Sequence, residues 1–253
     1  GAEGADYFLV YARTNPDPQA KPHHAISCFI VDRGPGVNVA YQYGLMGCRG
    51  GGTGRLVFKD VRVPKENLLG KPNGALEVFN TMMIPERLGT AAMTIGAARP
   101  ALEVAGSYSM KRKAFGQPIN RFQGVSFQVA EAAMLLDACR SLVYTTSLSV
   151  DRGADPNTVR RLVSETKRFV TESCQKVARN AMQVMGGIGY TNVFPIERIV
   201  RDLGLASIWT GTNEVMSMII AHEWYAEHAR TGSVRNVEAD APEALAEGEK
   251  IFD

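Results

Sequence analysis

Two features of the sequence combine residue types that can do chemistry on an acidic proton or bind an anion. Glu86 stands directly before Arg87 within an apolar stretch, and the basic triplet Lys111–Lys113 closes that stretch. A carboxylate can act as a general base, and the guanidinium fork of Arg112 matches the oxygens of a pyrophosphate. Taken alone, however, a glutamate on a helix is usually solvated, and cations at a helix end suit the helix dipole. The residues themselves therefore favour a surface role for Glu86 and leave both interpretations of Arg112 open.

Two glycine-rich segments are candidates for close contact with a ligand. Gly47–Gly54 lacks the Lys-Ser/Thr pair that opens a helix in a P-loop, and a strand is predicted after it, so a loop between strands is favoured. Gln183–Tyr190 carries three glycines at the end of a long helical pattern. Helix capping explains one of them, whereas three also suit the close approach of another backbone or of a ligand.

The histidines and cysteines do not form the pattern of a metal site or of a nucleophile. His23 and His24 lie in a proline-rich loop, and His222 and His228 have no Cys, His or carboxylate partners at metal-ligand spacing. The four cysteines are scattered without a Cys-x-x-Cys pair, which favours reduced thiols in an intracellular protein. No Ser/His/Asp arrangement can be recognised.

The composition is that of an ordinary globular protein. Its 253 residues, 45% hydrophobic and 21% charged, are enough for a substantial core in one or two domains. A formal net charge of +2 indicates no special attraction to nucleic acid or to membranes. No apolar run is long enough to span a bilayer, and no signal peptide is recognised. The chain has no initiator Met and starts almost at once with a strand-like segment, so we expect that it begins within a longer protein.

The first part of the chain is predicted to form β-strands. Turn-forming residues separate short segments that are rich in β-branched and aromatic residues, and no long helical pattern intervenes. This arrangement favours antiparallel pairing in a sandwich or barrel. The predicted strands are Tyr7–Tyr11, Ala25–Val31, Val37–Tyr43 and Arg55–Val63.

From about Gly74 the apolar residues recur at threes and fours, which predicts helices. Asp155 followed by Pro156 is a good N-cap and first-turn pair. Long helices joined by short loops indicate an antiparallel bundle, so the predicted fold class is α+β. The last stretch, Gly232–Asp253, is acidic and is expected to be a mobile or partner-docking tail. The predicted helices cover roughly 74–113, 123–151, 155–186, 194–203 and 212–229.

A series of short motifs runs along the chain. They are Leu45–Arg49 with Thr53, Val57–Pro64 with Asn67–Gly70, Arg112–Ile119 with Phe122 and Gln123, Gln183–Tyr190, Glu197–Asp202 and Gly211–Glu214. Each motif alone would be a weak signal. Together, in this order and from about residue 5 to 229, they resemble the acyl-CoA dehydrogenase family.

The resemblance implies a particular division of the chain. The family fold consists of an N-terminal helical domain, a central β domain and a C-terminal four-helix bundle. This chain would hold part of the central β domain over 1–66, the four-helix bundle over 67–230 and an acidic tail over 231–253. The N-terminal helical domain would lie outside it, so the chain would be a fragment or one piece of a split enzyme. The implied compartment is the cytoplasm of a bacterium or the mitochondrial matrix of a eukaryote.

Family members oxidise an acyl-CoA thioester to the 2,3-enoyl-CoA, with a glutamate that removes the α-proton and FAD that accepts the hydride. In many members that glutamate directly precedes the Gly-Thr of the C-terminal motif, where this chain has Thr210. One branch, which includes isovaleryl-CoA and long-chain dehydrogenases, places it on the first bundle helix before an arginine. The resemblance therefore implies that Glu86 is the base and that Arg87 lies at the substrate. The backbone N–H of Thr210 would still bind the thioester carbonyl.

The resemblance also implies a FAD site shared between subunits, in a homo-oligomer that is a dimer of dimers or in a complex with an N-terminal portion. Thr212 and Glu214 would lie near the ribityl–pyrophosphate region of FAD, although many relatives have Gln in place of Glu214. Electrons would pass to an electron-transferring flavoprotein. The residues that would contact the FAD of a neighbouring subunit are Arg112, Phe115, Gln123, Gln183 and Gly187.

Two alternatives remain open at this point. One is an acyl-CoA oxidase, which would pass the electrons to oxygen. The other is a non-catalytic assembly subunit, which Thr210 and the missing N-terminal portion favour and Glu86 opposes. The acyl chain is also open, because short, branched and cyclic groups all fit the motifs.

Overall fold

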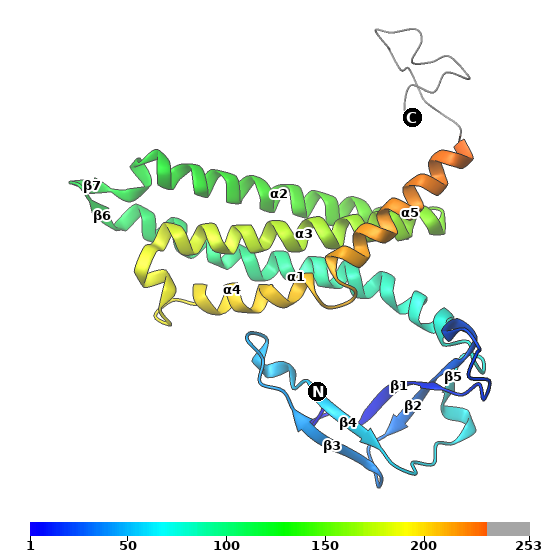
Figure 1. Cartoon of the computed structure of the whole chain (residues 1–253). Coiled ribbons are helices and arrows are strands. Elements are labelled where there is room, and N and C mark those ends of the chain that lie inside the picture. The colour runs from blue at the N-terminus through cyan, green and yellow to red at the C-terminus, as the bar shows by residue number, and fades with distance from the viewer. Residues whose placement is uncertain (232–253) are drawn as a thin grey trace, which may run out of the picture.

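The computed structural model describes residues 1–231 of the 253-residue chain. A small β portion comes first, and an elongated bundle of helices follows it (Figure 1). The predicted α+β class, with antiparallel strands before an antiparallel helical bundle, is confirmed. The predicted acidic tail, 231–253, lies outside the described residues except for Thr231.

The β portion consists of two small antiparallel sheets. One has the strand order β1-β2-β5 and the other pairs β3 with β4, so the predicted antiparallel pairing is confirmed. The sheets meet through Phe8 and Phe58, whose ring centroids lie 6.1 Å apart in an edge-to-face arrangement. The strands are β1 (Tyr7–Arg13), β2 (Ile26–Asp32), β3 (Val37–Gln42), β4 (Gly54–Phe58) and β5 (Leu68–Leu69).

The predicted end of the strand 55–63 is wrong, because β4 stops at Phe58. Beyond it, the N–H of Lys59 donates to the carbonyl of Gly36 at 2.9 Å, and Asp60 takes a left-handed φ of 53°. A strand cannot continue through a left-handed residue. The alternating valines after Asp60 therefore belong to an extended connection and not to the sheet.

The bundle helices agree with the sequence prediction to within a few residues. The side chain of Asp155 accepts a hydrogen bond from the N–H of Thr158 at 3.1 Å, so the predicted N-cap is confirmed. A two-stranded hairpin, β6 (Lys113–Ala114) and β7 (Gln117–Pro118), joins the first helix to the second. The helices are α1 (Ala75–Lys111), α2 (Gln123–Asp151), α3 (Pro156–Met185), α4 (Ile196–Gly204) and α5 (Asn213–Thr231).

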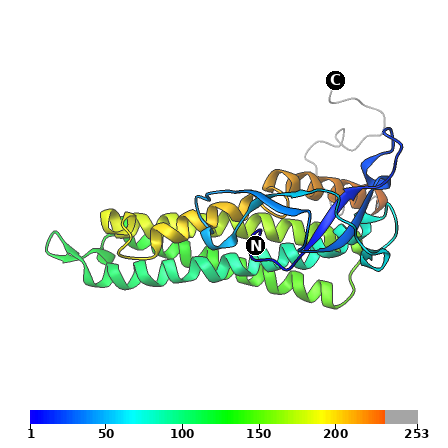
Figure 2. The same ribbon diagram turned by 90° about the horizontal axis from the view of Figure 1, so that it is seen from below.

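Helix α3 is the centre of the bundle and packs against α1, α2, α4 and α5. On α1, the buried residues Ala91, Ala98 and Ala105 repeat at every seventh position and so face one side of that helix. Their small side chains let α1 lie close to α3. Figure 2 shows the helices side by side along the long axis, with the β6–β7 hairpin projecting at one end.

The loop between β3 and β4 docks on the end of α4. Nη1 of Arg201 donates to the carbonyl of Met46 at 2.7 Å, and the N–H of Cys48 donates to Oδ1 of Asp202 at 2.6 Å. A Cβ on Gly47 would lie only 2.4 Å from the carbonyl carbon and oxygen of Arg201. Only glycine therefore fits at this position, where the β portion meets the bundle.

Candidate functional site

Arg87 links α1 to the connection between α4 and α5. The Arg87 side chain is buried, with 8% of its surface exposed, whereas its neighbour Glu86 is exposed. Nε of Arg87 donates to the carbonyl of Thr210 at 3.1 Å. The structure thus brings the Glu86–Arg87 turn of α1 against Thr210, two places that the sequence analysis selected separately.

The connection around Thr210 is a left-handed turn. Thr210 has a φ of 54° and Gly211 a φ of 92°. A non-glycine residue pays about 1–2 kcal/mol for this conformation, so the surroundings must hold Thr210 in place. A Cβ on Gly211 would lie 2.9 Å from Cε of Met216 and 3.5 Å from Nη2 of Arg87. The turn is therefore packed tightly against both α1 and α5.

Lys167 lies behind this turn, fully buried in the middle of α3. Its Nζ donates to the carbonyl of Gly211 and to Oδ1 of Asn213, both at 2.9 Å. Burial, and then the charge of Arg87, lower the pKa of Lys167 to about 8. The sequence analysis missed Lys167. A signal was present, because Lys167 interrupts the apolar face of α3 between Val163 and Val170.

The N–H of Thr210 has no acceptor in the part of the chain that the structure describes. The carbonyls of Thr210 and Gly211, in contrast, both accept hydrogen bonds from cations. A free N–H and a carboxylate that both reach one ligand can bind a carbonyl oxygen and remove a proton from the adjacent carbon. The carboxylate here is Glu86.

Five of the predicted cofactor residues lie at the end of the bundle that carries the β6–β7 hairpin (Figure 1). Arg112 follows the last turn of α1, and Phe115 stands in the hairpin with 95% of its surface exposed. Gln123 is the first residue of α2. Gln183 lies in the last turn of α3, and Gly187 lies in the 3-10 turn that follows. An exposed aromatic ring and an exposed guanidinium suit a dinucleotide that adjoins this end of the bundle.

The other two predicted cofactor residues, Thr212 and Glu214, lie elsewhere. They flank the start of α5, next to the turn that Arg87 holds. A hydrogen bond from Thr212 lowers the pKa of the Glu214 carboxyl. Along α1, Arg87 and Arg112 are 112 − 87 = 25 residues apart, which corresponds to about 37 Å at 1.5 Å per residue. One chain therefore does not bring the two groups together.

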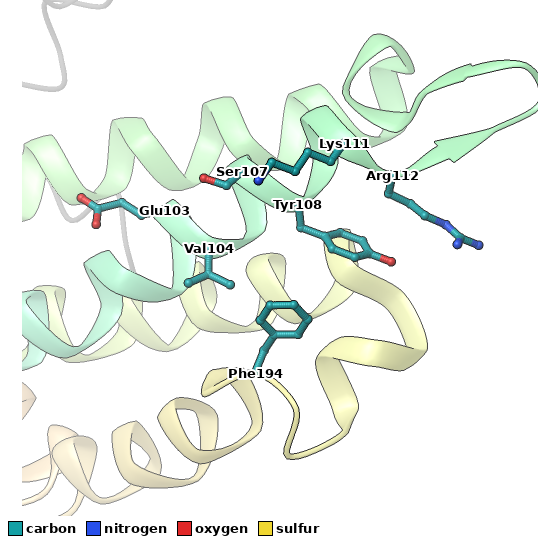
Figure 3. A pocket seen from close by; sticks show the side chains of 7 residues that line it. All are labelled: Glu103, Val104, Ser107, Tyr108, Lys111, Arg112 and Phe194. Atoms are coloured by element: carbon teal, nitrogen blue, oxygen red, sulfur yellow. The ribbon is translucent and has the colours of Figure 1, made fainter.

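A cavity of about 610 Å³ opens beside Arg112 at the end of α1. Tyr108 and Phe194 form an aromatic wall, with their ring centroids 6.2 Å apart. In Figure 3, Arg112 and the hydroxyl of Tyr108 extend to the same side, and Phe194 faces Tyr108 from the neighbouring segment. With Lys111 also in the lining, these residues could hold a planar ring next to an anionic group. The sequence analysis did not select Tyr108 or Phe194.

Other kinds of site find no support in the part of the chain that the structure describes. Residues 1–231 contain no cluster of three or more His, Cys, Asp or Glu side chains suited to a metal ion. Over the same residues, no helix combines the length and the apolar character that crossing a membrane requires. All four cysteines are free thiols.

Comparison of the sequence and the fold with known proteins identifies relatives of this chain. The family model described as acyl-CoA dehydrogenase, C-terminal domain, matches residues 74–224. An acyl-CoA dehydrogenase of Bacillus subtilis (strain 168) is 36% identical over 218 residues, which cover 86% of this chain and 56% of the relative. The caffeyl-CoA reductase-Etf complex subunit CarC of Acetobacterium woodii is 34% identical over 220 residues, 85% of this chain and 56% of the relative.

Solved structures show the same fold. The acyl-CoA dehydrogenase from Geobacillus kaustophilus superposes with a TM-score of 0.81 at 34% identity, over 87% of this chain and 57% of that one. The FAD complex of PigA superposes with a TM-score of 0.82 at 26% identity, over 89% of this chain and 58% of that one. The chain thus spans little more than half the length of the relatives that it matches.

Proposed function

The chain belongs to the acyl-CoA dehydrogenase family, and we propose that it supplies the base and much of the flavin site of an enzyme that converts an acyl-CoA thioester to the 2,3-enoyl-CoA. The observation that carries the proposal is the hydrogen bond from Arg87 to the carbonyl of Thr210. It supports a site in which Glu86 and the free N–H of Thr210 act on one thioester.

In this proposal each group has one task. The N–H of Thr210 donates to the thioester carbonyl and stabilises the negative charge that develops on its oxygen. The Glu86 carboxylate removes the α-proton, and Arg87, beside it, contacts the substrate as well as the turn. FAD supplies the redox chemistry by accepting the β-hydrogen as hydride. The exposure of Glu86 supports this assignment, because the base must be reachable from outside the bundle.

The proposed FAD site uses residues from two chains. Arg112, Phe115 and Gln123, with Gln183 and Gly187, would hold the FAD of a neighbouring subunit, and Thr212 and Glu214 would approach it from the chain that supplies Glu86. The separation of about 37 Å along α1 supports this division, since an extended dinucleotide is shorter. We infer from it a homo-oligomer, and we propose a dimer of dimers because the family resemblance implies one.

We also propose the remaining parts of the enzyme. The β portion, 1–66, would be part of a central β domain, and 67–230 would be the four-helix bundle. An N-terminal portion outside this chain would complete the thioester pocket. An electron-transferring flavoprotein is the proposed acceptor, which the name of the CarC relative, a subunit of a complex with Etf, supports. The acyl group stays open among short, branched and cyclic ones.

A second candidate follows from Thr210 itself. Many relatives have their catalytic glutamate at this position, where this chain has threonine. The same threonine would be found in a subunit that has lost its base. That candidate requires Glu86 to be dispensable.

The substitution Glu86→Gln separates the two candidates. In an enzyme assembled with its N-terminal portion, we expect turnover to fall by about 10²–10⁴-fold, because the amide cannot accept the α-proton. Steady-state reduction of a dye or flavoprotein acceptor measures it. Glu77→Gln is the matched control, since this exposed glutamate lies nine residues earlier on α1 and so on the opposite side of the helix. Unchanged turnover in Glu86→Gln would remove Glu86 as the base.

A further inference from the structure

Lys167 is a buried charge that the proposed chemistry has not used. It lies on the core face of α3, with Val163 and Val170 one turn away on either side, and no part of its surface is exposed. A buried ammonium is costly unless hydrogen-bond acceptors surround it. Its acceptors are the carbonyl of Gly211 and Oδ1 of Asn213. Asn213 is itself held by Thr171, at 3.1 Å from Nδ2 to Oγ1.

Arg87 binds the carbonyl of Thr210, just as Lys167 binds the carbonyl of Gly211 that follows it. Its Nε lies 3.1 Å from the oxygen of Thr210, and Nζ of Lys167 lies 2.9 Å from the oxygen of Gly211. Two consecutive carbonyls of one left-handed turn are therefore each held by a cation, one from α1 and one from α3. Because each peptide unit is planar, fixing these carbonyls also fixes the planes on both sides of Gly211.

The two cations explain how Thr210 keeps its unfavourable conformation. A threonine released from the turn would return to a negative φ, and the rotation would carry its N–H away from the present direction. The positive charges behind the turn also polarise the two peptide units whose carbonyls they bind, and these units contain the N–H groups of Gly211 and Thr212. The first effect, the fixed φ of Thr210, is the one that acts on the N–H of Thr210.

We propose that Lys167 is a positioning residue that, together with Arg87, clamps the Thr210–Gly211 turn so that the N–H of Thr210 meets the thioester carbonyl. The inference rests on the proposed function, because it assigns a task to that N–H. Lys167 itself touches neither the substrate nor the flavin. It acts through the carbonyl of Gly211 and, beyond it, through Thr210.

The test replaces Lys167 by methionine, whose unbranched side chain is one heavy atom shorter and has neither the charge nor the donors. Lys176→Met is the matched control, because Lys176 lies nine residues later on α3, on the opposite side, where it is exposed and pairs with Glu131. Both variants are made in the FAD-loaded enzyme that contains the N-terminal portion. Flavin content and thermal unfolding are measured first, to confirm that each variant is assembled.

Two measurements then report on the N–H of Thr210. We expect kcat of Lys167→Met to fall by about 10²–10³-fold with a much smaller change in KM, because the lost interaction forms only as charge develops. A bound 3-oxoacyl-CoA supplies the second measurement, since its enolate forms at lower pH where the thioester oxygen is stabilised. Its absorbance on titration with base should show that the enolate forms at higher pH in Lys167→Met than in Lys176→Met. A purely structural role of Lys167 would not change this second result.

The outcomes distinguish this inference from the function on which it rests. If Lys167→Met has the same kcat and the same enolate titration as Lys176→Met, the clamp is overturned and the proposed function is not. A wild-type enzyme whose flavin no thioester reduces would overturn the proposed function and the clamp with it. If Lys167→Met does not assemble, Lys167→Gln, which removes the charge and shortens the side chain so that it no longer reaches the carbonyl of Gly211 as the lysine does, replaces it with the same expected direction and the same contradicting result.

Discussion

At the scale of single residues, Arg112 and Phe115 differ most from their surroundings, because both extend from the end of the bundle with little of the chain around them. Phe115 is 95% exposed, and Arg112 lies at the edge of a cavity lined by Tyr108 and Phe194. Among residues 1–231, Phe115 is the most exposed of the large hydrophobic side chains. The proposed FAD would cover both side chains.

Replacing Arg112 by alanine should weaken FAD binding. A hydrogen bond to a charged group contributes about 1.5–3 kcal/mol, so we expect the dissociation constant of FAD to rise by about ten- to a hundredfold. Titration of the flavin-free enzyme with FAD, followed by fluorescence, measures the change. Arg152→Ala is the control, because Arg152 is exposed just after the last residue of α2, far from the hairpin end. Equal affinities in the two variants would contradict the assignment of Arg112.

The sequence predicted some residues of the candidate site and not others, for physical reasons. Glu86 and Arg87 were selected only through the family resemblance, because a glutamate on a helix is by itself usually solvated. The contact between Arg87 and Thr210 joins residues 123 positions apart and depends on how α4 returns to α1. Lys167 stands between valines on the apolar face of α3, but this signal alone does not assign it a partner, because a lysine on a helix usually reaches solvent. Its burial becomes evident only when the turn at Gly211 supplies its acceptors.

At the scale of elements, the loop of Met46, Gly47 and Cys48 is the contact that fixes the β portion on α4. Its hydrogen bonds to Arg201 and Asp202 require the backbone of Gly47 to lie against α4 without a side chain. α4 leads directly into the Thr210 turn, so this docking also supports the candidate site from the other side.

The substitution Gly47→Ala should loosen this contact. The new Cβ would lie 2.4 Å from the carbonyl carbon and oxygen of Arg201 and 2.6 Å from the N of Asp202, and we expect a loss of about 1–3 kcal/mol in the free energy of unfolding. Thermal and urea denaturation measure the change. Gly50→Ala is the matched control from the same loop, because a Cβ there meets nothing within 4 Å and Gly50 has no positive φ. An equal stability of the two variants would show that the loop is not docked in solution.

The sequence predicted the helices better than the strands. Helix α1 was predicted from its apolar spacing and continues through Pro85 and Pro100, because packing against α3 along its length outweighs the lost hydrogen bonds. The strand end at Phe58 was missed, since Val61 and Val63 keep the alternating pattern after Asp60 has turned the chain. A period of two describes extended backbone, whether or not it is paired.

At the scale of the whole molecule, the chain spans just over half of its relatives, and its two groups of proposed flavin contacts lie far apart on the bundle. Both facts support the proposal that the site is assembled from more than one piece. In that proposal an N-terminal portion supplies one part of the site and a second copy of this chain supplies another.

Complementation between two variants tests the shared site, at an FAD concentration that saturates the wild-type enzyme but lies well below the raised dissociation constant of Arg112→Ala. Chains that carry Glu86→Gln are mixed with chains that carry Arg112→Ala, with the N-terminal portion present, and the mixture is unfolded and reassembled. If Arg112 of one chain and Glu86 of its neighbour serve the same flavin, each pair of unlike chains contains one site in which both residues are intact. Random pairing of equal amounts makes half of all pairs unlike. Activity should then recover to about a quarter of the wild-type value. Recovery no greater than the sum of the separate variants would place both residues at one flavin within a single chain.

The measurement that tests the central claim most directly is the anaerobic absorption spectrum of the FAD-loaded enzyme before and after a panel of short, branched and cyclic acyl-CoA thioesters is added. The account predicts that at least one thioester bleaches the flavin band of the wild-type enzyme. It also predicts that the same thioester leaves the band of Glu86→Gln unbleached on the same timescale. An FAD-loaded wild-type enzyme whose band no thioester bleaches, or a Glu86→Gln variant that bleaches as fast as wild type, would contradict it.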